Sequence, residues 1–142
     1  MPHQQTFYSP HPCVHTPPAL PPPHQIYYSL AHARRARKQW DVGLMRIEQL
    51  APMAVDHVAR VINSHSAAEL LWAQEEPKNM GAWPYIRPRV ATLLHSLCPD
   101  HPATSAPTPI RFVGRAPSAS PATGSFAIHQ SETKAIIDAA LA

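Results

Sequence analysis

The sequence has only four glycines and two cysteines, and its first 33 residues contain no Lys, Arg, Asp or Glu. It also lacks any apolar run approaching the roughly 18 residues of a membrane-spanning helix. The charged start and apolar stretch of a secretory signal are missing, as is the arginine-rich start of a mitochondrial transit peptide. We therefore expect no membrane association, and the sequence shows no targeting signal.

Several short motifs that carry chemistry are also missing. Cys13 and Cys98 form no short motif, which favours reduced thiols over a disulfide. His11, Cys13 and His15 match no zinc spacing, so no metal site is expected. The glycine-rich phosphate loops and the G-x-S-x-G elbow of hydrolases do not occur. We therefore assign no catalytic residue and expect no enzymatic activity from this chain alone.

Proline, in contrast, is abundant, with 18 residues that are distributed unevenly. Eight of them lie among the first 24 residues, together with several His and Gln. Such a composition is typical of a disordered or polyproline-like segment. The sequence therefore predicts a disordered segment over residues 1–24 and one folded domain over residues 25–142.

The folded part alternates between two hydrophobic periods. Helical spacing is found over residues 25–39, from Pro52 onward, and over residues 82–97 and 131–141. Short apolar runs at 42–47, 69–74 and 110–114 are typical of buried strands. This order predicts an α/β fold with three α/β/α layers around a short, mostly parallel sheet. Because such a unit normally begins with a strand, we predict that the first strand is missing.

The helices carry more detailed predictions. Val55 and Leu97 are expected on buried helix faces. Pro88 should kink the third helix or delay its start, because proline removes a helical hydrogen bond. Ser131 is the expected N-cap of the last helix, which places His129 just before it, more as a cap or surface residue than as a base.

Polar residues follow the predicted strands, where open parallel sheets bind ligands. One alternative is an anion site built from arginine, and the other is a set of salt bridges to further domains. Glu75 and Glu76 could be an acid/base pair, although a structural role is favoured. The residues concerned are Arg46, Glu48, Gln74, Glu75, Glu76, Lys78, Asn79, Arg87, Arg89, Gly114 and Arg115.

A dense basic run occupies residues 34–38 (RRARK) on the first predicted helix. It could attract nucleic acid or act as an import signal. No RNA-binding signature or zinc finger accompanies it, so a solvated helix face is favoured. We therefore do not expect nucleic acid as a partner.

Three longer motifs resemble the C-terminal domain of the thiamine-diphosphate-dependent 2-oxoglutarate dehydrogenase component. They are residues 46–50 (RIEQL) with Pro52, residues 69–83 (ELLWAQEEPKNMGAW) continued by 85–89 (YIRPR), and residues 110–124 (IRFVGRAPSASPATG) followed by His129. Residues 26–30 (IYYSL) resemble the start of the preceding helix. The resemblance covers about residues 25–142 and implies a transketolase-like C-terminal domain.

The family enzyme is an oxidoreductase of the tricarboxylic acid cycle, which decarboxylates 2-oxoglutarate and passes the succinyl group to lipoamide. The resemblance implies that thiamine diphosphate and magnesium lie in earlier domains, and the Gly-Asp-Gly expected of their site is absent here. It implies a non-catalytic domain that supports the dimer, with the remaining domains or a second copy and the succinyltransferase component as partners. Its compartment would be the mitochondrial matrix in a eukaryote or the cytoplasm in a bacterium.

The resemblance also implies a regulatory role in some members, through acetyl-CoA or an adenine nucleotide such as AMP. Arg46 and Glu48 are the candidates carried over from the family motif, whereas Lys78 and Arg115 are candidates from their position after the strands. A free-standing regulatory module is thus the alternative function, and a basic-helix nucleic-acid binder is the second. The structural-loop candidates are Gln74, Glu75, Glu76, Asn79 and Gly81.

The sequence departs from the family before the first helix. Family members have a strand ending in Ser-Gly-Lys, whereas here His24 and Gln25 follow a proline-rich stretch. We therefore expect a truncated chain that lacks this strand.

Overall fold

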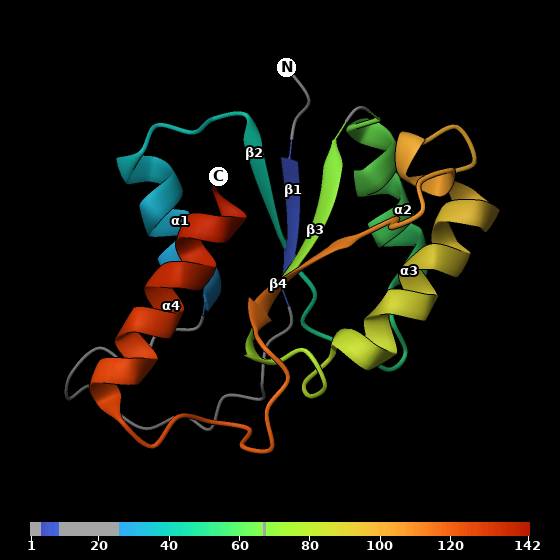
Figure 1. Cartoon of the computed structure of the whole chain (residues 1–142). Helices are drawn as coiled ribbons and strands as arrows, with labels where there is room; N and C mark the ends of the chain where they lie inside the picture. Colours follow the sequence, from blue (N-terminus) through green and yellow to red (C-terminus); the bar gives the residue numbers. More distant parts are fainter. Residues whose placement is uncertain (1–3, 9–25, 67) are drawn as a thin grey trace.

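The fold is a parallel sheet between two layers of helices (Figure 1). The computed structural model describes residues 4–8, 26–66 and 68–142. The strands are β1 (Gln4–Tyr8), β2 (Val42–Arg46), β3 (Glu69–Pro77) and β4 (Arg111–Arg115), in the order β2-β1-β3-β4. All their pairings are parallel. The predicted three-layer α/β/α class with a short parallel sheet is therefore confirmed.

The prediction of a missing first strand was wrong. Gln4 of β1 pairs in register with Val42 of β2 on one side and with Glu69 of β3 on the other. The segment QQTFY contains no proline and includes Thr, Phe and Tyr, which favour strands. The strand pattern of this short run was missed because the residues around it are rich in proline. The remainder of the expected disordered segment, including Cys13 and its neighbouring histidines, lies outside the described residues.

The central strand β3 divides the core into two clusters because its side chains alternate between the faces of the sheet. Leu70 and Trp72 belong to the cluster under α2 (Val55–Ser64) and α3 (Trp83–Leu97). Leu71 and Ala73 belong to the cluster under α1 (Ile26–Ala36) and α4 (Phe126–Ala140). Burial of both faces explains the unbroken apolar run in the sequence.

The α2 and α3 layer differs from the prediction at its ends. Val55 and Leu97 are exposed, and the buried face consists of Val58, Ala59, Ile62, Trp83, Ile86, Val90, Leu93 and Leu94. Helix α3 begins at Trp83, so Pro88 does not delay its start. An amide at Pro88 would have bonded only to the carbonyl of Pro84, so one hydrogen bond is lost and the helix continues.

The last helix begins five residues earlier than predicted. Helix α4 starts at Phe126, so His129 lies in its first turn and Ser131 lies inside it. The Ser131 hydroxyl donates to the carbonyl of Ile128 and caps nothing. The last helix breaker before α4 is Gly124, and the residues that follow are free of glycine and proline.

Contacts between the C-terminal ends of α1 and α4, including residues just beyond both helices, close the second layer. Arg37 forms an ion pair with Asp138, and the Gln39 amide donates to the carbonyl of Leu141 at 2.7 Å. In the part of the chain that the structure describes, no helix is both long and apolar enough to cross a membrane.

Candidate functional site

The candidate residues gather at one edge of the sheet because all four strands are parallel. Arg46, Pro77 and Arg115 end β2, β3 and β4, and the loops that follow begin on the same side of the molecule (Figure 1). The sequence predicted this carboxyl edge, but β3 extends to Pro77, so Glu75 and Glu76 lie in its last part and not in the loop after it. The candidate residues make different contacts at this edge.

Arg46 and Glu48 lie beside the first turn of α1. Their side chains form an ion pair, and Arg46 Nη1 donates to the hydroxyl of Tyr28 at 3.2 Å. The Arg46 guanidinium also lies 5.2 Å from the centre of the Tyr27 ring. The hydrogen bond to Tyr28, followed by the charge of Glu48, raises the pKa of Arg46. Arg46 is therefore held charged next to Tyr28, of which 56% is exposed.

Gln74 organises the loop between β3 and α3 from inside the protein. Its side chain is 1% exposed, and its Oε1 accepts from Trp72 Nε1 at 2.9 Å and from the backbone N–H of Trp83 at 3.0 Å. Its Nε2 approaches three carbonyl oxygens, including that of Met80 at 2.7 Å. A single amide thus satisfies buried polar groups on both sides of the loop. These contacts hold the loop around Gln74, whose structural role stays a prediction.

Gly81 completes the same loop with a φ of +67°, which glycine adopts without steric cost. A Cβ at this position would lie 2.9 Å from Gln74 Nε2 and 3.0 Å from the Cβ of Glu76. The loop therefore needs glycine for its backbone conformation and for its close packing against Gln74.

The β3–α3 and β4–α4 loops are joined by paired amide contacts. Asn79 Nδ2 donates to the carbonyl of Ser118, and Asn79 Oδ1 accepts from the Ser118 N–H, both at 3.0 Å. Arg115 Nε lies 3.1 Å from Glu132 Oε2, which also accepts from the Thr123 hydroxyl at 2.6 Å. These contacts fasten the two loops over the ends of β3 and β4.

The Glu132 carboxylate makes the stability of this region depend on pH. The Thr123 hydrogen bond, followed by the charge of Arg115, lowers the pKa of Glu132 below its ordinary value of 4.5. A lowered carboxyl pKa stabilises the folded state above the ordinary value, and this stability is lost as pH falls through the folded pKa. We expect Glu132→Gln to flatten the dependence of unfolding free energy on pH below about 5.

Urea unfolding at stepped pH values tests this prediction. Thr123→Val should give an intermediate slope, because it removes the hydrogen bond and leaves the arginine in place. Equal pH slopes for the native chain and Glu132→Gln would contradict the prediction.

The candidate residues do not share one cavity. Glu75, Glu76 and Arg115 line a hollow of about 330 Å³ with Thr123 and His129. Lys78 instead lines a larger cavity of about 690 Å³ between α3 and the segments that flank β4. Arg46 and Glu48 contact Tyr28, on the other half of the carboxyl edge. The four regulatory candidates therefore lie at three separate places on the carboxyl edge.

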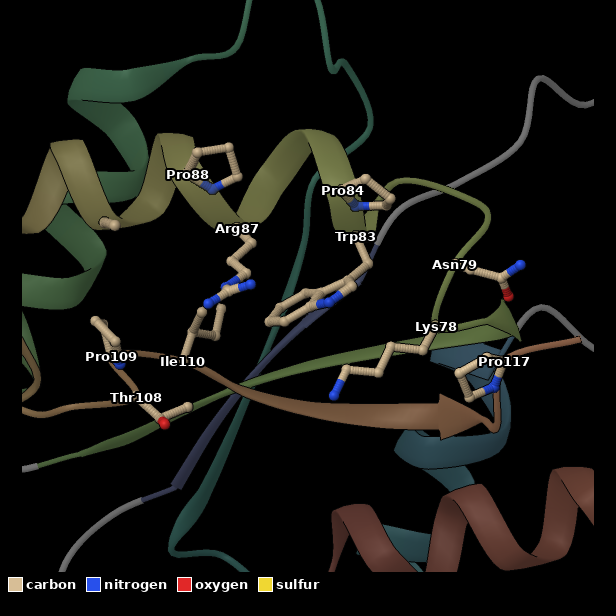
Figure 2. Close-up of a pocket in the computed structure, with 11 residues that line it drawn as sticks. Lys78, Asn79, Trp83, Pro84, Arg87, Pro88, Thr108, Pro109, Ile110 and Pro117 are labelled. Carbon is tan, nitrogen blue, oxygen red and sulfur yellow. The ribbon is translucent and has the colours of Figure 1, made fainter.

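The larger cavity contains residues that sequence reasoning did not combine. Figure 2 shows Trp83 and Arg87 descending from α3, with Lys78 running beneath them and Ile110 opposite. Trp83 lies 5.1 Å from Phe112, measured between ring centres. Trp83 and Arg87 are four residues apart, a spacing that places them on one helix face and could have identified the pair. The pairing of Thr123 with Glu132 has no comparable signal in the sequence.

The basic run, residues 34–38, covers the last residues of α1 and the two that follow it, and it is partly occupied by internal contacts. Arg34 donates to the carbonyl of Val42 and lies over the Trp40 ring, and Arg37 pairs with Asp138. Two of its four cationic side chains are thus held against the protein. The predicted solvated face is thereby reduced to Arg35 and Lys38, which are exposed.

The fold and its carboxyl edge define a doubly wound α/β domain whose polar loops are fastened to one another. Residues 24–141 match a family profile described as 2-oxoglutarate dehydrogenase C-terminal. The chain belongs to this family.

Curated relatives agree with this assignment. The chain is 43% identical over 111 residues to the mitochondrial 2-oxoglutarate dehydrogenase of Caenorhabditis elegans, which covers 78% of this chain and 10% of that protein. It is 37% identical over 117 residues to the 2-oxoglutarate dehydrogenase E1 component of Brucella anthropi, covering 82% of this chain and 11% of the relative. The chain thus spans about a tenth of the length of the curated relatives it matches.

Proposed function

We propose that this chain acts as a structural domain that packs onto the remaining domains of a 2-oxoglutarate dehydrogenase and supports its dimer. The parent reaction would be oxidative decarboxylation of 2-oxoglutarate with succinyl transfer to lipoamide in the tricarboxylic acid cycle. Thiamine diphosphate and magnesium would be held by those other domains, and the succinyltransferase component would meet the assembled enzyme. The compartment would be the mitochondrial matrix or, in a bacterium, the cytoplasm.

One observation carries this proposal: the carboxyl edge combines internally paired charges with exposed apolar side chains. Phe126 and Ile128, in the first turn of α4, are 75% and 51% exposed. Tyr28, in the first turn of α1, is also exposed and accepts a hydrogen bond from Arg46 at the end of β2. Figure 1 places the start of α4 on the same side as the strand tips. Exposed large apolar groups beside satisfied polar groups are typical of interfaces.

Complementation tests the proposal directly. The full chain is mixed with Caenorhabditis elegans 2-oxoglutarate dehydrogenase from which the segment matching this chain has been deleted. We expect the two to elute together and to recover 2-oxoglutarate-dependent activity with thiamine diphosphate and magnesium. Phe126→Glu should weaken this association, whereas Leu97→Glu, an exposed position at the far end of α3, should not. Separate elution and no recovered activity would refute the proposal.

Regulation by acetyl-CoA or an adenine nucleotide is the second candidate function. The position of Arg46 and Glu48 beside exposed Tyr28 favours it, because an aromatic ring and a guanidinium can bind a base and a phosphate together. Lys78 and Arg115 would contribute only to separate contacts. Calorimetric titration with acetyl-CoA and with AMP tests this idea. Heat that Arg46→Ala abolishes, and that the control Arg60→Ala retains, would support it, and no heat with either ligand would refute it.

A nucleic-acid partner is the weakest alternative. Arg34 and Arg37 are held by internal contacts, so only Arg35 and Lys38 of the basic run remain to bind it. Absence of filter binding even at low salt would eliminate it.

A further inference from the structure

We propose that the open edge of β4 binds an extended, acidic segment of a partner protein, which adds a fifth strand to the sheet. Among the described residues, β4 has only β3 as a neighbouring strand, so its other edge is open. An open edge presents backbone N–H and C=O groups to any extended chain that can reach it.

The space for a fifth strand exists on both faces of the edge. On the α3 face, the 690 Å³ cavity reaches from Thr108 and Ile110, before β4, to Pro117 after it. On the α4 face, a groove of about 470 Å³ is lined by residues 111–116 and by Ala135 and Ala139 of α4. Both helix layers therefore extend beyond the last strand and leave grooves above and below its edge. A strand paired to β4 would direct alternate side chains into these two grooves.

The charges of the α3-side groove select the chemistry of the segment. Lys78 and Arg87 are the charged residues that line it, and no ion pair of either is found in the part of the chain that the structure describes. Lys78 Nζ lies 5.8 Å from the centre of the Phe112 ring, so its charge is close to the edge strand. Figure 2 shows Lys78 and Arg87 on the two sides of this cavity, with Trp83 between them. A carboxylate entering this groove would meet both cations.

The α4-side groove has the opposite character. Arg111 already pairs with Glu69, and Arg115 with Glu132, so these arginines are neutralised. The α4 wall consists of Ala135, Ile136 and Ala139, together with Glu132, whose carboxylate is paired with Arg115. Apolar side chains of moderate size fit there. The complementary segment therefore alternates acidic and apolar residues.

A second copy of this chain is a poorer occupant. Its own edge strand, RFVGR, contains two arginines and no acidic residue. It would offer no carboxylate to Lys78 and Arg87, so it lacks the charge complementarity of an acidic segment. Charge complementarity thus favours a different polypeptide.

Fluorescence anisotropy with the full chain tests this proposal. The probe is a labelled peptide of about seven alternating Glu and Val residues, close to the usual strand length. We expect saturable binding, which is lost when alternate peptide nitrogens are methylated, because methylation blocks strand pairing. Replacing Glu by Lys in the probe should also abolish binding.

Three variants at exposed positions locate the site. The double variant Lys78→Glu/Arg87→Glu should weaken binding at least about tenfold at low salt, because two attractive contacts become repulsive. Ala135→Arg should weaken it comparably by filling the α4-side groove. The matched control Arg89→Glu lies on α3 but lines a different cavity, so its affinity should stay within about threefold.

Three outcomes would overturn the proposal. They are no binding at millimolar peptide, equal binding of the methylated peptide, or an Ala135→Arg variant with unchanged affinity. Concentration-dependent dimers of the native chain that Ala135→Arg abolishes would show that a second copy occupies the edge instead. Because only this chain and the peptide are present, failure here is distinct from failure of the complementation experiment.

Discussion

Gln74→Leu is expected to lower the free energy of unfolding by roughly 3–5 kcal/mol, since each buried polar group left unsatisfied costs about 1–3 kcal/mol. Leucine has nearly the same volume, but it leaves the indole N–H of Trp72 and the backbone N–H of Trp83 without their acceptor. It also removes the donor that reaches the carbonyl of Met80. The loss is a large share of the about 5–15 kcal/mol by which domains are usually stable.

Urea unfolding of the two chains measures this loss as a lower midpoint. Gln130→Leu is the matched control, because Gln130 is exposed on α4 and should change stability by less than about 0.5 kcal/mol. The Gln74→Leu chain should also bind the peptide at the β4 edge more weakly, because the Gln74 amide holds the loop that carries Lys78. A Gln74→Leu chain as stable as the native one would show that the amide network contributes little.

The sequence predicted the fold class correctly because both signals it used are local. The run over β3 and the helical spacing of α2 and α3 reflect burial within each element. The first strand, Gln4–Tyr8, was not predicted, because only five residues carry its pattern and prolines dominate the residues around them. Its place between β2 and β3 is a long-range pairing that no local pattern records.

The carboxyl edge was predictable for the same reason, whereas its contacts were not. Parallel strands bring Arg46 and Arg115 to one edge, and any sequence reading that finds the strands finds this edge. The partner of Arg115 depends on where α4 begins, and that start was misplaced by five residues. The open β4 edge depends on strand order, which the alternation of elements leaves undetermined.

Gly81→Ala is expected to destabilise the chain by about 2–4 kcal/mol, through two separate effects. Its φ of +67° costs an alanine roughly 1–2 kcal/mol, because Cβ approaches the backbone carbonyl. The new Cβ would also overlap Gln74 Nε2 at 2.9 Å and the side chain of Glu76. Gly124→Ala is the matched control, since a Cβ there meets no atom within 4 Å. A similar loss in both variants would contradict the prediction.

A double-mutant cycle separates the two effects of Gly81→Ala. In a Gln74→Ala background the overlap with Nε2 disappears, but the cost of the backbone conformation and the contact with Glu76 remain. The added loss from Gly81→Ala should therefore be smaller there by about 0.5–3 kcal/mol, the range seen for residues in contact. Strict additivity would mean that the overlap with Gln74 Nε2 adds nothing to the loss. A coupled result would show that Gln74 and Gly81 jointly fix the loop that presents Lys78 to the β4 edge.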